Sequence, residues 1–318
     1  MSTKRILAIT GGVGGAKLSL GLANILGSEE LAFVVNSADD FRHLGFHVSP
    51  DIDTLVYTLS GTANTDTGWG RCDEGWLFMQ ALQELGGETW FALGDKDLAM
   101  HVERTRLLAE GWSLSDVTKH LASALGIHFP IFPMCDESLR TLVETDKGVL
   151  DFQTYFVRER CEPTVRGFIY DGAGDSGLNT ALLAWVDESP PSGIIICPSN
   201  PYVSIDPILK VNGMRDFLRD CLAPVIAVSP VVAGQAIKGP TVKMMRELGV
   251  SATAESVAAY YADFLDGFVL DIEDEERQPA IEAMGLQTTV TQTVMRSLED
   301  RVALAGVCLE FVDYMSSR

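Results

Sequence analysis

The N-terminal part of the chain alternates short apolar runs with glycine-rich or polar turns. The apolar run Arg5–Thr10 ends in Gly11–Gly15, after which Ala16–Leu26 carries apolar residues at helical spacing. A second β-branched run, Leu31–Val35, ends in the polar stretch Asn36–Asp40. This order predicts a strand, a glycine turn, a helix and a second strand, which is the βαβ unit of a doubly wound sheet.

Two later apolar runs, Gly193–Cys197 and Pro224–Val228, are rich in isoleucine and valine without polar interruption. Continuous apolar runs are typical of strands that are buried on both faces, so both are predicted to be central parallel strands. The first ends at Pro198–Pro201, and a helix is predicted at Pro240–Leu248 after the second. Ligands of such sheets bind beyond the C-terminal ends of the strands.

Residues 66–191 show a different pattern, with helical and strand-like segments in no regular alternation. We expect an α/β fold, with a Rossmann-like, doubly wound, mainly parallel sheet built from residues 1–65 and 192–318 and a smaller α+β lobe inserted at 66–191. The lobe should hold helices and then strands, in the order Trp76–Leu85, Leu98–Ala109, Leu114–Leu125, Ile131–Met134 and Phe152–Val157. The end of the chain predicts helices at Val257–Leu265 and Val290–Ala305 around a strand at Phe268–Asp271.

Composition narrows the class of protein. The 318 residues are 47% hydrophobic and 21% charged, which excludes a disordered chain, and the net charge of −20 argues against nucleic acid or an anionic membrane as a partner. The longest apolar runs have the length of strands, so no membrane span is predicted. Met1–Leu7 fits a first strand better than a signal peptide, which makes the cytoplasm the expected location.

The glycine turn Gly11–Lys17 is the first candidate binding site. It departs from both the dinucleotide and the P-loop patterns, yet its glycines allow close approach of a diphosphate, the helix offers free N–H groups, and Lys17 adds a positive charge. Gly12, Gly14, Gly15 and Lys17 are therefore candidate ligands of a diphosphate. A tight turn with a purely structural role is the alternative.

Acidic residues follow the second strand closely. Asp39 and Asp40 stand where dinucleotide enzymes place a ribose-binding acid, which keeps an NAD(P)-dependent oxidoreductase open. Asp51 and Asp53 follow within a few residues, and we expect their side chains on a common side, suited to a Mg²⁺ ion that bridges phosphate oxygens. The alternative is a solvated acidic turn in which Asp53 caps a helix at Thr54–Leu59.

Two groups of lysines are further candidates. Lys96 lies in an acid–lysine–acid run next to Trp90 and Phe91 and can reach an anion or the polar edge of a flat ligand; the alternative is a helix N-terminus capped by Asp97. Lys238 precedes a predicted helix, where it belongs either to a second anion site or to a solvated helix face.

Taken together, these residues resemble the 2-phospho-L-lactate transferase family, which completes the core of the deazaflavin coenzyme F-420 from the precursor FO. The glycine turn and the aspartate pair also occur in the wider superfamily, whereas the segment Trp90–Asp97 points to the transferase branch. The motifs extend over most of the chain: Gly11–Leu18, Asn36–Asp40, His47–Thr54, Trp90–Asp97, Cys197–Pro201 and Ala236–Pro240.

The resemblance implies a reaction and roles for the residues. The donor is a lactate, enolpyruvate or glycerate activated by guanosine diphosphate, the acceptor is the terminal ribityl hydroxyl of FO, GMP is released, and Mg²⁺ is the metal ion. The catalytic residues are then Asp51, Asp53 and Lys96, with Asp51 orienting the hydroxyl or accepting its proton. The metal ligands are Asp39, Asp40 and Asp51, and the nucleotide-binding residues are Gly12, Gly14, Gly15, Lys17, Ser199, Asn200 and Lys238.

Several points stay open at this level. Ser37–Ala38 and Met134–Cys135 depart from the family pattern, so a contact of Cys135 with ligand is undecided. The three-carbon acid and the oligomeric state, a homodimer among the options, are not fixed by the sequence. A non-catalytic nucleotide-sugar-binding regulator of the same superfamily is the second alternative, because it would keep the glycine turn without an FO pocket.

Overall fold

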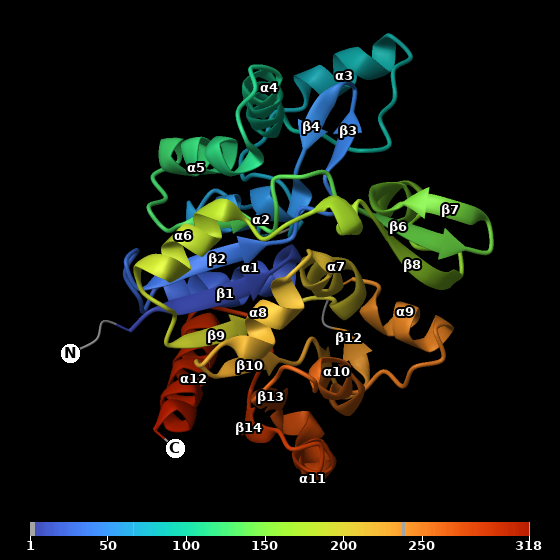
Figure 1. Cartoon of the computed structure of the whole chain (residues 1–318). Helices are drawn as coiled ribbons and strands as arrows, with labels where there is room; N and C mark the ends of the chain where they lie inside the picture. Colours follow the sequence, from blue (N-terminus) through green and yellow to red (C-terminus); the bar gives the residue numbers. More distant parts are fainter. Residues whose placement is uncertain (1–3, 66, 237–238, 318) are drawn as a thin grey trace.

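A computed structural model describes residues 4–65, 67–236 and 239–317. Its centre is a sheet of seven parallel strands in the order β14-β13-β10-β9-β1-β2-β5 (Figure 1). This confirms the Rossmann-like, doubly wound, parallel fold predicted from the apolar runs. The strands are β1 (Ile6–Thr10), β2 (Leu31–Val35), β5 (Ile131–Pro133), β9 (Gly193–Ile196), β10 (Val225–Val228), β13 (Gly267–Asp271) and β14 (Gln287–Thr291).

Helices cover both faces of this sheet, which explains the uninterrupted apolar character of its central strands. Alternate residues of β1 enter two separate buried clusters, one on each face. Helices of one face include α1 (Gly12–Ala23), α2 (Pro50–Leu59), α4 (Asp95–Ala109), α5 (Leu114–Ala124) and α12 (Leu298–Ser316). Those of the other face include α6 (Thr180–Glu188), α7 (Asp206–Lys210), α8 (Met214–Asp220), α9 (Thr241–Glu247), α10 (Ala254–Tyr261) and α11 (Gln278–Glu282).

Small antiparallel sheets and further short elements surround the main sheet. The hairpin β3 (Phe41–His43) and β4 (Phe46–Val48) lies near α3 (Leu77–Glu84) and α4 in Figure 1, at the top of the view. The three-stranded sheet β7-β6-β8 projects to the right of the view. Its strands are β6 (Arg140–Thr145), β7 (Gly148–Asp151) and β8 (Val165–Asp171), and a second hairpin consists of β11 (Val231–Val232) and β12 (Gln235–Ala236).

The range 66–191 contributes to the main sheet, which differs from the predicted boundary of the lobe. Strand β5 pairs in parallel with β2 at the edge of the sheet, so residues 131–133 belong to the core. A second difference concerns Phe152–Val157, which is no strand. The segment Thr154–Arg158 forms a π-helix, η1, in which Glu159 N donates to Thr154 O at 2.9 Å.

The C-terminal prediction of one helix over Val290–Ala305 is wrong. Strand β14 extends to Thr291, and α12 begins only at Leu298. Ser297 sets this start through a capping box with Asp300, whose carboxylate accepts from the backbone of Ser297 at 2.9 Å. The apolar periodicity carried no sign of this boundary.

The chain order reverses at the boundary between β1 and β9. Strands β2 and β5 lie on one side of β1, and the four later strands lie on the other. In open parallel sheets, ligands bind in the crevice beyond the strand ends at this switch point. The two turns that leave β1 and β9 meet there, because Gly11 N donates to Ser199 Oγ at 3.3 Å.

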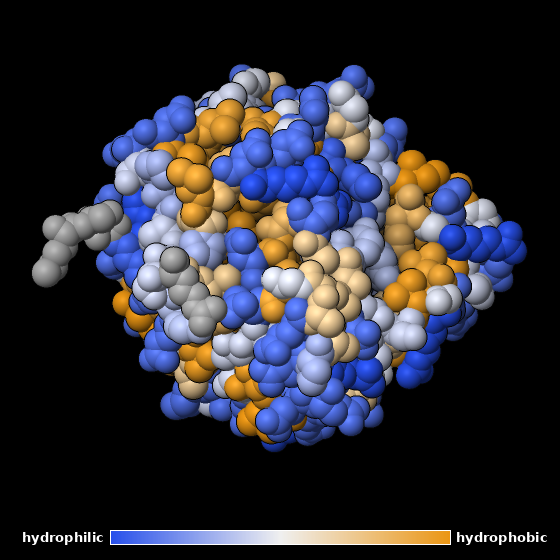
Figure 2. Space-filling view, turned by 60° about the horizontal axis from the view of Figure 1, so that its bottom comes forward, coloured by the Kyte–Doolittle hydropathy of each residue, from blue (hydrophilic) through white to orange (hydrophobic). Residues whose placement is uncertain are grey.

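The surface agrees with the composition. In the part of the chain that the structure describes, no helix has both the length and the apolar character required to cross a membrane. Figure 2 shows a face that is mostly hydrophilic, with hydrophobic residues in separate patches and a hollow near the middle of the view.

Candidate active site

The glycine turn opens α1 with an unoccupied helix N-terminus. Gly11 is extended (φ −163°), and the first turn of α1 contains no acidic residue and no side-chain cap. Gly12 adopts φ +65°, which favours glycine, and a Cβ there would have no neighbour closer than 3.8 Å. The free N–H groups and the open space at Gly12 make this terminus suitable for an anion.

Gly14 and Gly15 are glycines for a different reason from the one expected. A Cβ at Gly14 would overlap the carbonyl oxygen of Pro198, and one at Gly15 would overlap the hydroxyl of Thr10. Both positions therefore let α1 pack closely against the turn that follows β9. A valine at position 14 would displace backbone, so this substitution reports on folding as well as on nucleotide binding.

The remaining predicted nucleotide ligands are held by the protein itself. Asn200 Oδ1 accepts from Tyr202 N at 2.9 Å and caps the π-helix η3 (Pro201–Ile205), while Ser199 Oγ accepts from Gly11 N. Lys17 Nζ donates to Met295 O at 3.0 Å. Lys238 lies outside the described residues.

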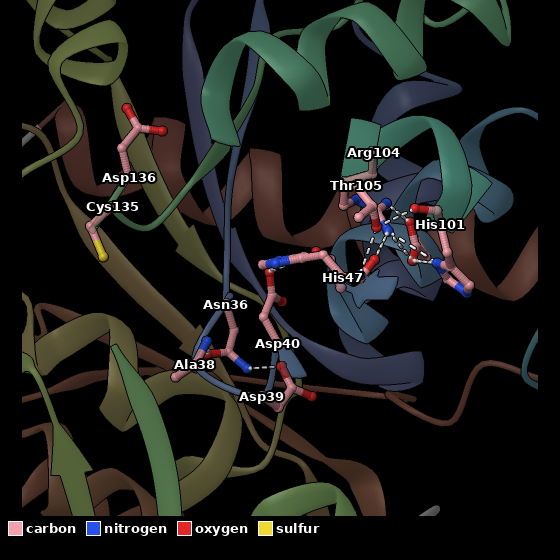
Figure 3. Close-up of polar contacts among 12 residues, drawn as sticks. Asn36, Ala38, Asp39, Asp40, His47, His101, Arg104, Thr105, Cys135 and Asp136 are labelled. Atoms are coloured by element: carbon pink, nitrogen blue, oxygen red, sulfur yellow. Dashed lines mark hydrogen bonds and ion pairs between the residues drawn. The ribbon is translucent and has the colours of Figure 1, made fainter. Parts of the chain in front are cut away.

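Three carboxylates meet beyond the end of β2. Asn36 Nδ2 donates to Asp39 Oδ1 and to Asp51 Oδ2, both at 2.9 Å (Figure 3 shows the bond to Asp39). Gln153, just before η1, donates to the second oxygen of Asp39 at 3.2 Å. Asp40 interacts electrostatically with both carboxylates, so Asp39, Asp40 and Asp51 form one cluster as predicted.

Burial makes the charges of this cluster costly. It raises the pKa of Asp51 to about 6, although hydrogen bonds from Asn36 and the backbone of Gly12 oppose the shift. Burial and the charges of Asp51 and Asp40 raise the pKa of Asp39 well above its usual range. A group with these properties favours a bound cation.

Asp40 has one free carboxylate oxygen. His47 Nε2 lies 2.9 Å from Asp40 Oδ2, and Ser49 Oγ donates to the same atom at 2.6 Å. Its other oxygen, Oδ1, is buried without a hydrogen-bond partner among the described residues. An all-oxygen group with an unpaired buried carboxylate oxygen fits a hard divalent cation such as Mg²⁺, and His47 and Ser49 would then orient the ligand.

The raised pKa of Asp51 predicts a measurable effect on stability. In metal-free protein at pH 7.5, Asp51→Asn should raise the free energy of unfolding by about 3 kcal/mol, because the folded state then holds no costly charge. The wild-type penalty fades as pH falls through the folded pKa, about 6, towards the usual value of 3.8, so the gain should shrink at pH 5. Urea unfolding in EDTA at both pH values checks this. An equal or opposite effect at the two pH values contradicts the buried-charge argument.

Asp53 does not share a side with Asp51, contrary to the prediction. Helix α2 begins at Pro50, so both residues lie in its first turn, where a separation of two residues points side chains in nearly opposite directions. Ser49, rather than Asp53, is the N-cap residue. Arg104 donates to both oxygens of Asp53, with a separation of 3.1 Å on Oδ2.

Asp53 belongs to a second, fully buried network. His101 Nε2 lies 3.3 Å from Asp97 Oδ2, and Tyr57 Oη donates to Asp97 Oδ1 at 2.6 Å. Ligand atoms of Asp53, Asp97 and His101 lie within 4.8 Å of one another, which is compatible with a divalent metal ion. The guanidinium of Arg104 already occupies Asp53, however, so the group also works as a charged link between α2 and α4.

Lys96 lies on the outer side of this network. It is exposed in the first turn of α4, and its Nζ donates to Cys72 O at 3.3 Å. The N-cap of α4 is Gly94, not Asp97, and Glu74 accepts from the backbone N–H of Lys96 at 2.8 Å. Lys96 is thus separate from the carboxylate cluster in its hydrogen bonds.

Sequence reasoning missed several residues of the site. Asn36 gave a signal, because a polar amide directly after a buried strand faces the ligand edge of the sheet. Arg104 and His101 share one face of α4 with Asp97, at helical spacing. Gln153 gave none. Cys135, which was left open, is buried and donates to Glu137 O at 3.5 Å, and Figure 3 places it apart from the carboxylates.

Comparison with known proteins assigns the family. Residues 6–302 match the family described as 2-phospho-L-lactate transferase CofD. The chain belongs to this family. It is 36% identical to the 2-phospho-L-lactate transferase of Methanosarcina mazei, over 96% of this chain and 99% of that protein. The phosphoenolpyruvate transferase of Kitasatospora aureofaciens is 35% identical, with 97% and 98% covered.

A solved structure supports the fold. A Bacillus halodurans protein of the UPF0052 family has a TM-score of 0.63 at 14% identity, covering 97% of this chain and 100% of that one. The family membership makes the chain a transferase, and both relatives are named as transferases. Neither the oxidoreductase nor the regulator gains support from these comparisons.

Proposed function

We propose that this transferase moves a phospho-lactyl or phospho-enolpyruvyl group from a guanosine-diphosphate-activated three-carbon acid to the deazaflavin FO. GMP leaves, and the product is the phosphodiester precursor of coenzyme F-420. One observation carries the proposal. The Asp51 carboxylate, in a carboxylate cluster, is hydrogen-bonded to the backbone of Gly12, at the open N-terminus of α1.

This juxtaposition suits transfer from a diphosphate. The N–H groups at the start of α1 would bind the diphosphate at the switch point of the sheet. The acceptor hydroxyl would attack the distal phosphorus, forming one P–O bond while the bond to the bridging oxygen of GMP breaks. Asp51, whose pKa is raised to about 6 by burial, is suited to orient that hydroxyl and accept its proton.

The residues around the cluster fit Mg²⁺, as the free oxygen of Asp40 indicates. Asp39, Asp40 and Asp51 would hold the ion, which supplies charge neutralisation of the diphosphate when bound. Asn36 keeps Asp39 and Asp51 at a fixed separation through its two bonds. Lys96 is proposed as an acceptor-site residue, since its side chain is exposed at the start of α4.

Product analysis tests the proposed reaction. The protein is incubated with FO, Mg²⁺ and, separately, lactate, enolpyruvate or glycerate activated by guanosine diphosphate, and the products are identified by mass. A phosphodiester of FO together with GMP is expected for at least one donor. The identities of 36% and 35% to the two kinds of relative do not select a donor, so the assay also makes that choice. Absence of an FO adduct with every donor contradicts the proposal.

Removal of the metal is expected to abolish turnover. Excess EDTA should lower the rate by about a hundredfold or more, because the clustered carboxylates otherwise repel the diphosphate, and added Mg²⁺ or Mn²⁺ should restore it. Asp39→Asn should raise the Mg²⁺ concentration needed for half-maximal rate. Asp97→Asn, in the other candidate group, serves as the comparison and should leave that concentration unchanged. Full turnover in EDTA contradicts the metal requirement.

A further inference from the structure

A small cleft lies between the loop after α2 and the start of α4. Its lining includes Trp69, Arg71, Glu74, Trp76 and Asp97, which we call the tryptophan cleft. Its volume is about 20 Å³, room for roughly one water molecule. The mechanism described above uses none of its side chains.

Two exposed indoles form its walls. Trp69 and Trp76 are 50% and 39% exposed, and their rings lie 6.4 Å apart in an edge-to-face arrangement. Helix α3, which follows Trp76 directly, buries none of its residues. Exposed aromatic pairs of this kind leave a large apolar area in water, which a flat ligand can cover after one indole turns outward.

The floor of the cleft contains an unpaired donor. Nε of Arg71 is buried and has no hydrogen-bond partner in the described ranges, while its guanidinium lies 5.4 Å from the centre of the Tyr57 ring. An unmade hydrogen bond of this kind costs about 1–3 kcal/mol.

The acceptors of the cleft are already used. Glu74 accepts from the backbone N–H groups of Lys96 and Asp97, at 2.8 and 2.9 Å. Asp97 accepts from the Tyr57 hydroxyl. The cleft therefore offers a donor without a partner, and the complementary ligand must bring an acceptor.

Helix α2 connects the cleft to the carboxylate cluster. Asp51 stands in its first turn, and Tyr57, which lies under Arg71, comes six residues later in the same helix. At 1.5 Å per residue this separation is about 9 Å along the helix axis. A ligand ring in the cleft would thus lie about the length of a short chain from Asp51.

We propose that the tryptophan cleft binds a flat heteroaromatic ring with a carbonyl group on its edge. The ring stacks on Trp69 or Trp76, and Arg71 donates to the carbonyl. The assignment rests on the proposed function, in which the acceptor has such a ring joined by a polyhydroxy chain to the reacting hydroxyl. The guanine of the donor shares this edge chemistry, so both sources must be tested.

Calorimetric titration of the full-length protein with FO and, separately, with GDP tests the proposal. Trp76→Ala and Arg71→Lys should each weaken one of the two ligands by about tenfold or more, which is the effect of losing one ring contact. Loss of FO affinity with unchanged GDP affinity assigns the acceptor ring to the cleft, and the reverse assigns guanine. Trp112→Ala is the matched control, since Trp112 is also exposed, at 43%, and pairs with His120.

The outcomes separate this proposal from the proposed function. Unchanged affinity for both ligands in Trp69→Ala, Trp76→Ala and Arg71→Lys, with thermal unfolding as in the wild type, overturns the cleft as a ring site. Wild-type protein that binds FO through these residues but forms no phosphodiester overturns the proposed reaction and leaves the cleft assignment intact. In an active enzyme, the cleft variants should raise KM for the affected substrate more than they lower kcat.

Discussion

Asp51→Asn is expected to lower turnover by about a hundredfold or more, whereas the affinity for GDP changes little. The substitution keeps the shape of the side chain and its ability to accept from the backbone of Gly12. It removes the charge that would hold the metal ion or accept the proton of the acceptor hydroxyl. The nucleotide is unaffected in this view, because the N-terminus of α1 binds it through backbone N–H groups.

Steady-state rates with FO and calorimetric titration with GDP measure the two effects. Asp216→Asn is a suitable control, because the Asp216 side chain is 76% exposed and lies on α8, whose buried residues pack on the opposite face of the sheet from α2. Near-normal turnover of Asp51→Asn would make Asp51 a structural residue of α2. The catalytic role would then pass to Asp39 or Asp40, since both oxygens of Asp53 are bound by Arg104.

Arg104→Met is expected to lower the free energy of unfolding by about 3–5 kcal/mol, because it leaves the buried Asp53 carboxylate without its partner. Arg104 is 1% exposed and Asp53 is 4% exposed, so water cannot replace the lost bonds. Domains are stable by only about 5–15 kcal/mol, so this loss is a large part of the total. Urea unfolding measures it.

The same helix supplies a matched control. Arg106 is paired with Glu103 and Glu110 on the surface of α4, with its side chain 50% exposed. Arg106→Met should change stability by at most about 1 kcal/mol, as is usual for exposed pairs. The double variant Arg104→Met/Asp53→Asn should recover part of the loss, because no buried charge remains. A loss below about 1 kcal/mol in Arg104→Met contradicts the buried network.

The sheet was predictable because its strands are buried on both faces. Ile6–Thr10, Leu31–Val35 and Gly193–Ile196 carry that burial directly as apolar runs, and the glycine turn marks the end of the first. The π-helix at Thr154–Arg158 was not predictable, since its aromatic and β-branched residues equally suit a strand. Strand β5 was found, but its membership of the main sheet depends on a pairing with β2 far away in the chain.

The site was predictable as a set of residues and only in part as a geometry. The carboxylates after β2 were expected, and Asp39, Asp40 and Asp51 do meet. Asp53 was misplaced because the helix was expected to start at Thr54; its actual start at Pro50 gives the two aspartates helical rather than common-side directions. Asn36, which fixes Asp39 and Asp51, depends on contacts across the fold that no local pattern contains.

The central position of β1 has a consequence for synthesis of the protein. One neighbour, β2, leaves the ribosome soon after it, but the other, β9, begins only at Gly193. At ordinary rates of translation the interval is on the order of ten seconds. During that time β1 has one unpaired edge, and Gly14 and Gly15 lack Pro198 and Ser199, against which they pack. The anion-binding terminus of α1 is therefore completed late, and a nascent chain that ends before residue 200 should not yet retain nucleotide.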